Sequence, residues 1–136
     1  MARWVASSIE DLPVVADGDA DDPVWYPLQH ALGIDTFGAN VFVADRDGQL
    51  LVEAHDESES GQQELYLLLD GTAVFELDGE DARLERGDVL SVVDPSVRRR
   101  ATALTAGTKL LVVGASSGSF ESSWNAAHFA DIRRPA

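Results

Sequence analysis

The chain contains no cysteine and a single lysine, Lys109, among its 136 residues. The absence of cysteine excludes disulfides and thiol catalysis, and it removes the usual mark of a small secreted domain. Basic residues number 10 against 24 acidic residues, so the formal net charge is -14. Because a field of this sign repels nucleic acid and anionic membranes, we expect neither as a partner.

Long apolar runs are also missing. No run approaches the roughly 18 residues that a membrane-spanning helix requires, and residues 1–5 lack the apolar core of a signal peptide. We therefore expect a soluble, cytoplasmic protein. The hydrophobic fraction of 45% in 136 residues suits one folded domain with a core of its own rather than a disordered chain.

Short β-rich runs alternate with turn residues along most of the sequence. We predict three antiparallel pairs of strands: 40–44 with 49–55, 72–77 with 82–85, and 98–104 with 108–113. No stretch before residue 116 shows a helical period. Turn signals at intervals of about 8 to 12 residues are typical of an all-β sandwich or barrel.

The pattern changes near the C-terminus. Phe120, Trp124 and either Ala127 or His128 fall at the spacing of one helical face, which predicts a short helix that covers the barrel. An acidic run over residues 17–23 is expected to form a solvated loop. The predicted organisation is an N-terminal strand and acidic loop (1–24), a β-barrel (25–115), and a C-terminal helix and tail (116–136).

Two potential metal ligands, His55 and Glu57, stand two residues apart at the end of a predicted strand. That spacing points both side chains to one face of the strand. A polar loop follows, and then Glu64 opens an apolar strand that ends at Asp70-Gly71. The chain therefore concentrates its chemistry between residues 55 and 71.

Glu64, the six residues after it and Gly71 resemble the second half of the first cupin motif, in which a His-x-His pair precedes Glu-x6-Gly. The run from Gly87 through Pro95 resembles the second cupin motif, which ends in a histidine ligand. The resemblance, to small single-domain cupins of the conserved-barrel type, covers roughly residues 37–114. It implies an all-β fold, an antiparallel β-barrel or jelly roll.

The resemblance implies a metal set of His55, Glu57 and Glu64, with Glu57 at the place of the second histidine. One imidazole and two carboxylates suit one divalent ion, Fe²⁺, Mn²⁺ or Zn²⁺. The third histidine position falls on Arg98 when counted from the glycine of the second motif and on Arg100 when counted from its proline.

A guanidinium stays protonated and cannot ligate a metal. The alternative is a site rebuilt around arginine, in which Glu64 or Glu57 pairs with Arg98 or Arg100. The candidate ligand-binding residues of such a site are Glu64, Tyr66, Arg98, Arg99 and Arg100. We expect them to hold an anionic or carbonyl-bearing small molecule. The alternative, considered for Arg99 in particular, is that the arginines lie outside the barrel.

Three functions remain open from the sequence, and catalytic residues cannot be assigned. The first is a small-molecule-binding cupin whose metal site is degenerate. The second is a metal-dependent cupin enzyme, of the dioxygenase or isomerase type, that uses His55, Glu57 and Glu64. The third is a non-catalytic structural or regulatory protein.

The predicted strand 65–69 is apolar on both faces. Tyr66 and Leu68 share the face of Glu64. Leu65, Leu67 and Leu69 lie on the other face and need cover on the outside of the barrel. We predict a homodimer formed by sheet-to-sheet packing. The alternative is that the N-terminal segment, through Trp4, covers the same face.

Overall fold

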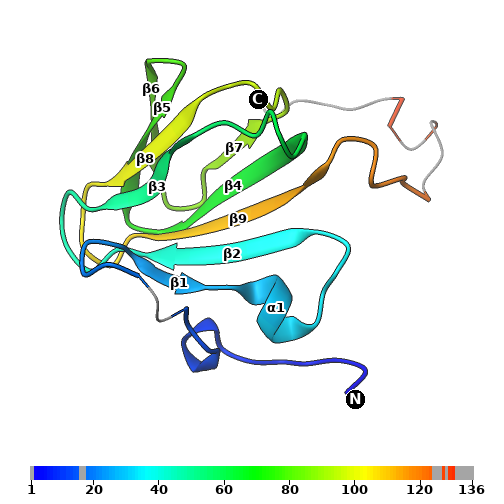
Figure 1. Ribbon diagram of the computed structural model, residues 1–136, viewed down its shortest axis with the longest axis horizontal. Helices are drawn as coiled ribbons and strands as arrows, with labels where there is room; N and C mark the ends of the chain where they lie inside the picture. The colour runs from blue at the N-terminus through cyan, green and yellow to red at the C-terminus, as the bar shows by residue number, and fades with distance from the viewer. Residues whose placement is uncertain (1, 16–17, 124–126, 128, 131–136) are drawn as a thin grey trace.

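Two antiparallel sheets face each other in the computed structural model, which describes residues 2–15, 18–123, 127 and 129–130 (Figure 1). The first sheet has the order β1 (Val24–Tyr26), β2 (Gly38–Val43), β9 (Lys109–Ser116), β4 (Gln62–Asp70) and β7 (Val89–Val92). The second has the order β3 (Leu50–His55), β8 (Arg99–Ala103), β5 (Thr72–Leu77) and β6 (Glu80–Glu85). This strand order is that of a double-sheet jelly roll. The prediction of an all-β fold is therefore confirmed.

The closed barrel is not confirmed, because no strand pairing joins the two sheets within the residues described. Their inner faces instead pack together as a sandwich, and the buried core includes Leu68, Phe75 and Leu110. Tyr66 meets Phe75 edge-on across this interface, with ring centroids 5.0 Å apart. Since no strand pairing closes the sandwich, space is left between the two sheets at one end.

Two of the three predicted strand pairs are wrong. Strands β2 and β3 lie in different sheets, and so do β8 and β9. The loops between them carry the chain from one sheet to the other, and they hydrogen-bond to each other rather than closing hairpins. Gly48 N donates to Ala103 O at 2.8 Å, and Gly107 N donates to Ala44 O at 2.8 Å. Short apolar runs around a turn do not by themselves tell a hairpin from a corner.

The third predicted pair, β5 with β6, is confirmed as a hairpin. Asp78 and Gly79 form its turn with φ angles of 51° and 86°. A two-residue turn with positive φ at both positions matches the twist of the flanking strands, and Asp-Gly is well suited to it.

Two short helical segments precede β2. A 3-10 turn, η1 (Ile9–Asp11), lies near the N-terminus, and α1 (Leu28–Leu32) follows Pro27 and ends at Gly33, whose φ is 73°. The prediction of no helix before residue 116 is therefore wrong. A helix of five residues is too short to display a period in the sequence.

The predicted C-terminal helix is not confirmed. No helix occurs over residues 117–123, and the side chain of Phe120 is 84% exposed. Trp124 and His128, which were to complete its apolar face, lie outside the described residues. In the part of the chain that is described, no helix has the length and apolar character needed to cross a membrane.

The outer face of the five-stranded sheet carries exposed apolar side chains beside strand β4. Leu65 is 44% exposed, and Val89 and Val93 are each 63% exposed. The inner-face residues Tyr66 and Leu68 are buried, so the predicted alternation along β4 is correct. Trp4 is 79% exposed, and the proposal that it covers this face is wrong.

Candidate functional site

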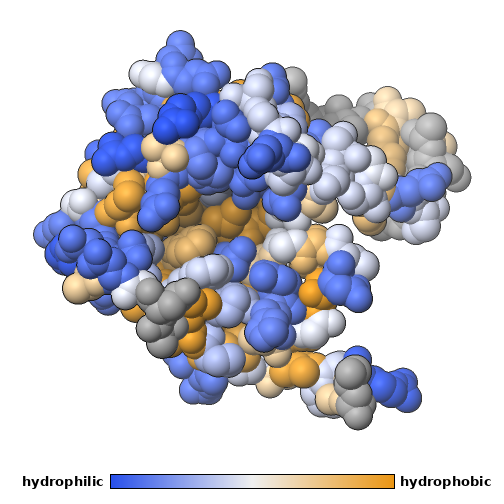
Figure 2. All heavy atoms as spheres, viewed as in Figure 1, coloured by the Kyte–Doolittle hydropathy of each residue, from blue (hydrophilic) through white to orange (hydrophobic). Residues whose placement is uncertain are grey.

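A cavity of about 520 Å³ opens between the two sheets. Its lining comes from β1, β2, β4 and β9 on one side, from β3 on the other, and from the N-terminal segment. Figure 2 shows the hollow with apolar residues at its floor and hydrophilic residues along its rim. A volume of this size lies within the range of about 300–1,000 Å³ that is usual for small-molecule sites.

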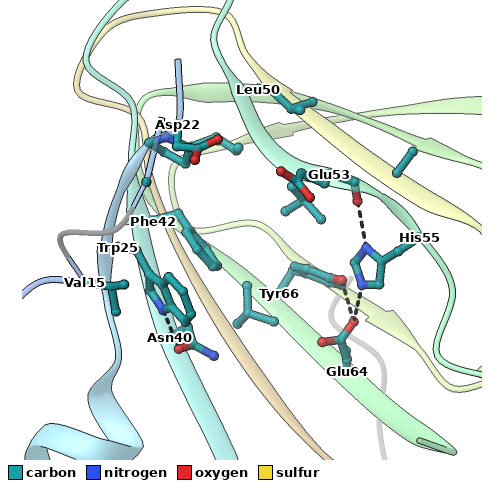
Figure 3. A pocket seen from close by; sticks show the side chains of 16 residues that line it. Val15, Asp22, Trp25, Asn40, Phe42, Leu50, Glu53, His55, Glu64 and Tyr66 are labelled. Atoms are coloured by element: carbon teal, nitrogen blue, oxygen red, sulfur yellow. Dashed lines mark hydrogen bonds and ion pairs between the residues drawn. The ribbon is translucent and has the colours of Figure 1, made fainter. Parts of the chain in front are cut away.

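One wall of the cavity is aromatic. Trp25 on β1 lies opposite Phe42 on β2 in the strand register, and the two rings have centroids 6.1 Å apart at an interplanar angle of 31°. The indole Nε1 of Trp25 donates to Asn40 Oδ1 at 2.7 Å, which fixes the orientation of the ring (Figure 3). Tyr66 extends the same wall along β4. The sheet thus presents a row of preoriented rings to the cavity.

Glu64 lies at the polar end of this wall. Its Oε1 accepts a hydrogen bond from the Tyr66 hydroxyl at 2.6 Å and another from Arg99 Nη1 at 2.8 Å. The side chain of Arg99 is 0% exposed and that of Glu64 is 10% exposed. Burial raises the pKa of Tyr66 well above its usual value, and the bond to the carboxylate of Glu64 adds to this effect. The hydroxyl therefore stays protonated and donates a hydrogen bond to the carboxylate of Glu64.

Arg99 is held by carbonyl oxygens as well as by Glu64. Its Nε and Nη2 donate to Val97 O at 3.1 and 2.9 Å, and Nη2 also lies 3.4 Å from Pro95 O. These bonds turn the guanidinium away from solvent and satisfy most of its donors. It acts as the support that fixes Glu64 and is not among the residues that line the cavity.

The prediction that Arg98 or Arg100 pairs with Glu64 or Glu57 is wrong, because Arg99 makes that pair. In β8 the inward positions are 99 and 101, which lie opposite the inward residues of β5. Arg100 points outward and pairs with Glu76 at 3.2 Å. Arg98 is exposed, and its backbone N donates to Asp78 Oδ1 at 2.8 Å. Arg98 and Arg100, the two positions obtained by counting from the second motif, are therefore both outward-facing, and the inward residue is the one between them.

His55 stands at the mouth of the cavity, at the end of β3. Its Nδ1 lies 2.7 Å from Glu53 O, and its Nε2 lies 3.1 Å from Glu57 Oε1 and 4.0 Å from Glu64 Oε1. Ser60 Oγ donates to the second oxygen of Glu57 at 2.6 Å and holds that carboxylate in place. The structure therefore brings together the three residues of the predicted metal set.

The ligand atoms of His55, Glu57 and Glu64 all lie within 4.8 Å of one another, so the group can hold a metal ion. A proton on Nδ1 directed to the Glu53 carbonyl leaves the lone pair of His55 on Nε2, facing the carboxylates, as in many metal-bound histidines. The donor set is one that Fe²⁺, Mn²⁺ and Zn²⁺ accept. The feature that opposes a cation is Arg99, which brings a full positive charge to the same oxygen of Glu64.

Several lining residues were missed by the analysis of the sequence, namely Asp22, Trp25, Asn40, Phe42 and Glu53. Trp25, Asn40 and Phe42 share a sheet with Glu64 through the strand order, in which β2 and β9 separate β1 from β4, whereas Asp22 lies in the loop before β1 and Glu53 on β3 of the second sheet. The sequence around Asn40 and Phe42 predicts a strand. Nothing in that local pattern indicates that one face of the strand borders a cavity.

No family model matches the chain, and no curated protein matches it by sequence. Solved structures do. A cupin protein from Bacteroides fragilis has a TM-score of 0.70 at 18% identity, over 99% of this chain and 100% of that one. A sugar phosphate isomerase of the cupin superfamily from Silicibacter pomeroyi has a TM-score of 0.65 at 17% identity, over 83% of this chain and 76% of that one.

The cupin domain of Cnp3 from Schizosaccharomyces pombe is also similar, with a TM-score of 0.64 at 12% identity over 83% of this chain and 74% of that one. One of these three proteins is named as an enzyme, and the names of the other two state no activity. Their shared feature is the arrangement of the two sheets.

Proposed function

The chain has the cupin fold, and we propose that it binds a small organic molecule in the cavity between its sheets. The observation that carries this proposal is the cavity of about 520 Å³, with an aromatic wall that ends at a fixed carboxylate. Trp25, Tyr66 and Glu64 are each held by hydrogen bonds to neighbours, so the site is formed before a ligand arrives. Preorganised walls reduce the entropy that binding costs.

The expectation of an anionic ligand depended on arginines in the pocket. Neither lysine nor arginine is among the residues that line the cavity. For the same reason we do not extend to this chain the phosphate-bearing substrate implied by the name of the Silicibacter pomeroyi protein. A donor to a carbonyl oxygen is available in the side-chain amide of Asn40, which lines the cavity and uses only its Oδ1 toward Trp25.

Blocking the cavity tests the proposal. Ala54 is an exposed residue of β3 among those that line the cavity, so we expect Ala54→Trp to obstruct the cavity and to leave the buried core in place. Asp81→Trp, on exposed β6, is the matched control. Saturation-transfer NMR with a fragment library that includes alcohols, carbonyl compounds, amines and carboxylates should give hits that Ala54→Trp loses and Asp81→Trp keeps. A library without hits, or hits that Ala54→Trp retains, would favour the structural or regulatory alternative.

A metal-dependent enzyme is the second candidate, and the clustered ligand atoms of His55, Glu57 and Glu64 favour it. A divalent ion bound there would polarise a substrate held in the cavity. This chain would supply the aromatic wall and the fixed orientation of Glu64. Calorimetric titration with Mn²⁺ and Zn²⁺ tests the site. Binding to the wild type with loss of binding in His55→Ala supports it, and equal binding by both proteins rejects it.

We also propose that a second copy of the chain covers the exposed outer face of the first sheet. Leu65, Val89 and Val93 lie side by side there, because Leu65 pairs with Ser91 in the register of β4 and β7. Burying such a patch favours association. Light scattering at micromolar concentration should give twice the chain mass, and Val89→Glu should reduce it to one. A wild-type mass of a single chain contradicts the dimer.

A further inference from the structure

The carboxylates that line the cavity outnumber its basic groups. Asp22, Glu53 and Glu64 line it from three separate segments of the chain, and His55 is the one basic residue among the lining residues. Arg99 neutralises Glu64 from behind. The charges of Asp22 and Glu53 have no comparable partner at the cavity, so its opening carries net negative charge beside an apolar wall.

Asp22 is held at this opening by the loop before β1. Its Oδ2 accepts a hydrogen bond from Asp19 N at 2.9 Å. The loop is attached to the body of the protein through Gln49, which is 2% exposed and donates from Nε2 to Asp21 O at 3.0 Å. Gln49 Oε1 in turn accepts from Asp45 N at 2.6 Å. Residues 18–22 of the acidic run are exposed, as expected of a solvated loop, and they are also attached at the cavity rim.

Glu53 faces the same space from β3. Figure 3 shows its carboxylate directed into the cavity, on the side opposite Phe42 and below Asp22. Within the described residues, no hydrogen bond or ion pair is recorded for the side chain of Glu53, although its carbonyl orients His55. A carboxylate at the mouth of an apolar cavity attracts a cationic group that brings hydrogen-bond donors.

The aromatic wall suits an apolar group joined to such a cation. Trp25 and Phe42 both line the cavity, and their ring centroids lie 6.1 Å apart. Aromatic side chains offer large apolar surfaces against which a flat group packs. Charge and aromatic surface thus suit the two ends of one ligand, a cation joined to an apolar group.

We infer that the cavity takes an organic cation, a primary amine joined to a flat apolar group, with the ammonium between Asp22 and Glu53 and the apolar group against Trp25 and Phe42. This inference rests on the proposed function, because it names the ligand class of the same cavity. It excludes phosphorylated and carboxylated ligands, since they would face Asp22, Glu53 and Glu64 with no arginine or lysine to bind them.

Three probes of one shape test the inference: 2-phenylethylamine, 2-phenylethanol and 3-phenylpropionate. With EDTA present, so that no divalent ion bridges carboxylates, calorimetry should give an affinity about tenfold higher for the amine than for the alcohol, and the carboxylate should bind least. Added salt should weaken the binding of the amine more than that of the alcohol.

Glu53→Gln should bring the affinity for the amine down toward that for the alcohol. Glu80→Gln, which removes the same charge from exposed β6, should leave the preference for the amine in place. If the alcohol or the carboxylate binds at least as tightly as the amine, the inference is overturned. In that case loss of binding in Ala54→Trp would leave the proposed function standing. If none of the three probes binds, or if Glu53→Gln keeps the full preference, the inference is also overturned.

Discussion

Arg99 and Arg100 are consecutive residues of β8, and each pairs with a glutamate, but the two ion pairs lie on opposite faces of the sheet. The Arg99–Glu64 pair lies inside, with side-chain exposures of 0% and 10% and a distance of 2.8 Å. The Arg100–Glu76 pair lies outside, with exposures of 48% and 49% and a distance of 3.2 Å. The pleat of the strand, and not the residue type, determines which arginine helps to build the site.

The two pairs should differ in energetics as much as in position. An exposed pair is screened by water and commonly contributes about 0–1 kcal/mol. A buried pair has lost the hydration of both ions, so removing one partner leaves a charge without compensation. The inner pair is therefore a support that the site cannot lose, and the outer pair is a surface contact.

The largest effect is expected from Arg99→Met. The variant leaves the carboxylate of Glu64 buried beside the Tyr66 hydroxyl and frees the carbonyls of Pro95 and Val97 from their donor. We expect a loss of about 3–5 kcal/mol in the free energy of unfolding, measured by urea denaturation. A loss below about 1 kcal/mol would place the pair with ordinary surface contacts.

The double variant Glu64→Leu with Arg99→Met sharpens the comparison, because it removes both charges and leaves none unpaired. Apolar replacement of a complete buried pair is often neutral or stabilising by about 1–4 kcal/mol relative to the charged pair. The double variant should therefore regain most of the stability that Arg99→Met loses. Losses that simply add, with no coupling between positions 64 and 99, would show that the two side chains do not interact.

Glu64→Gln keeps an oxygen that can accept hydrogen bonds from Arg99 and Tyr66, but it removes the negative charge. A fully stranded guanidinium costs about 3–5 kcal/mol, and we expect a loss at the lower end of that range because the amide oxygen still accepts. Thermal unfolding at neutral pH gives the difference from the wild type. A change of a few tenths of a kcal/mol would mean that the charge of Glu64 does not matter to Arg99.

Tyr66→Phe removes one hydrogen bond to the charged Glu64 and should cost about 1.5–3 kcal/mol. The effect should also depend on pH. Burial raises the pKa of Tyr66 above its ordinary value of 10.0, so above that pH the unfolded chain releases a proton that the folded chain keeps. Wild-type stability should then fall more steeply with pH than that of the variant, by up to about 1.4 kcal/mol per pH unit. Parallel curves between pH 9 and pH 11 would contradict the raised pKa.

The smallest effect is expected from Arg100→Met, which matches Arg99→Met in chemistry and differs in the face of the strand. We expect a change of about 0.2–1 kcal/mol in urea denaturation, which shrinks further in salt. A loss as large as that of Arg99→Met would remove the distinction between the two pairs.

Part of this arrangement could be predicted from the sequence. The spacing of Glu64, Tyr66 and Leu68 gave their common face correctly, because alternation along a strand is a local property. The choice among Arg98, Arg99 and Arg100 failed, because it depends on how β8 aligns with β3 and β5. That register includes irregularities along β3. Counting residues from a motif cannot detect such shifts.

The pairing of strands was harder to predict than their existence. The Asp78-Gly79 turn makes a true hairpin, whereas Asp47-Gly48 lies in a loop that passes from one sheet to the other. The two loops that make this crossing are stabilised by each other, through Asp47 Oδ1 and Ala106 N at 2.7 Å. Trp25 and Glu53 belong to the site through the same long-range arrangement, which no local pattern encodes.

The central claim is that a buried arginine has made Glu64 a wall of a ligand cavity, where the cupin motif would have a metal centre. Elemental analysis of protein purified without a histidine tag, after dialysis against trace Fe²⁺, Mn²⁺ and Zn²⁺, tests it most directly. The account predicts well below one metal ion per chain in the wild type. Close to one ion per chain, lost in His55→Ala, would contradict it and establish the metal site.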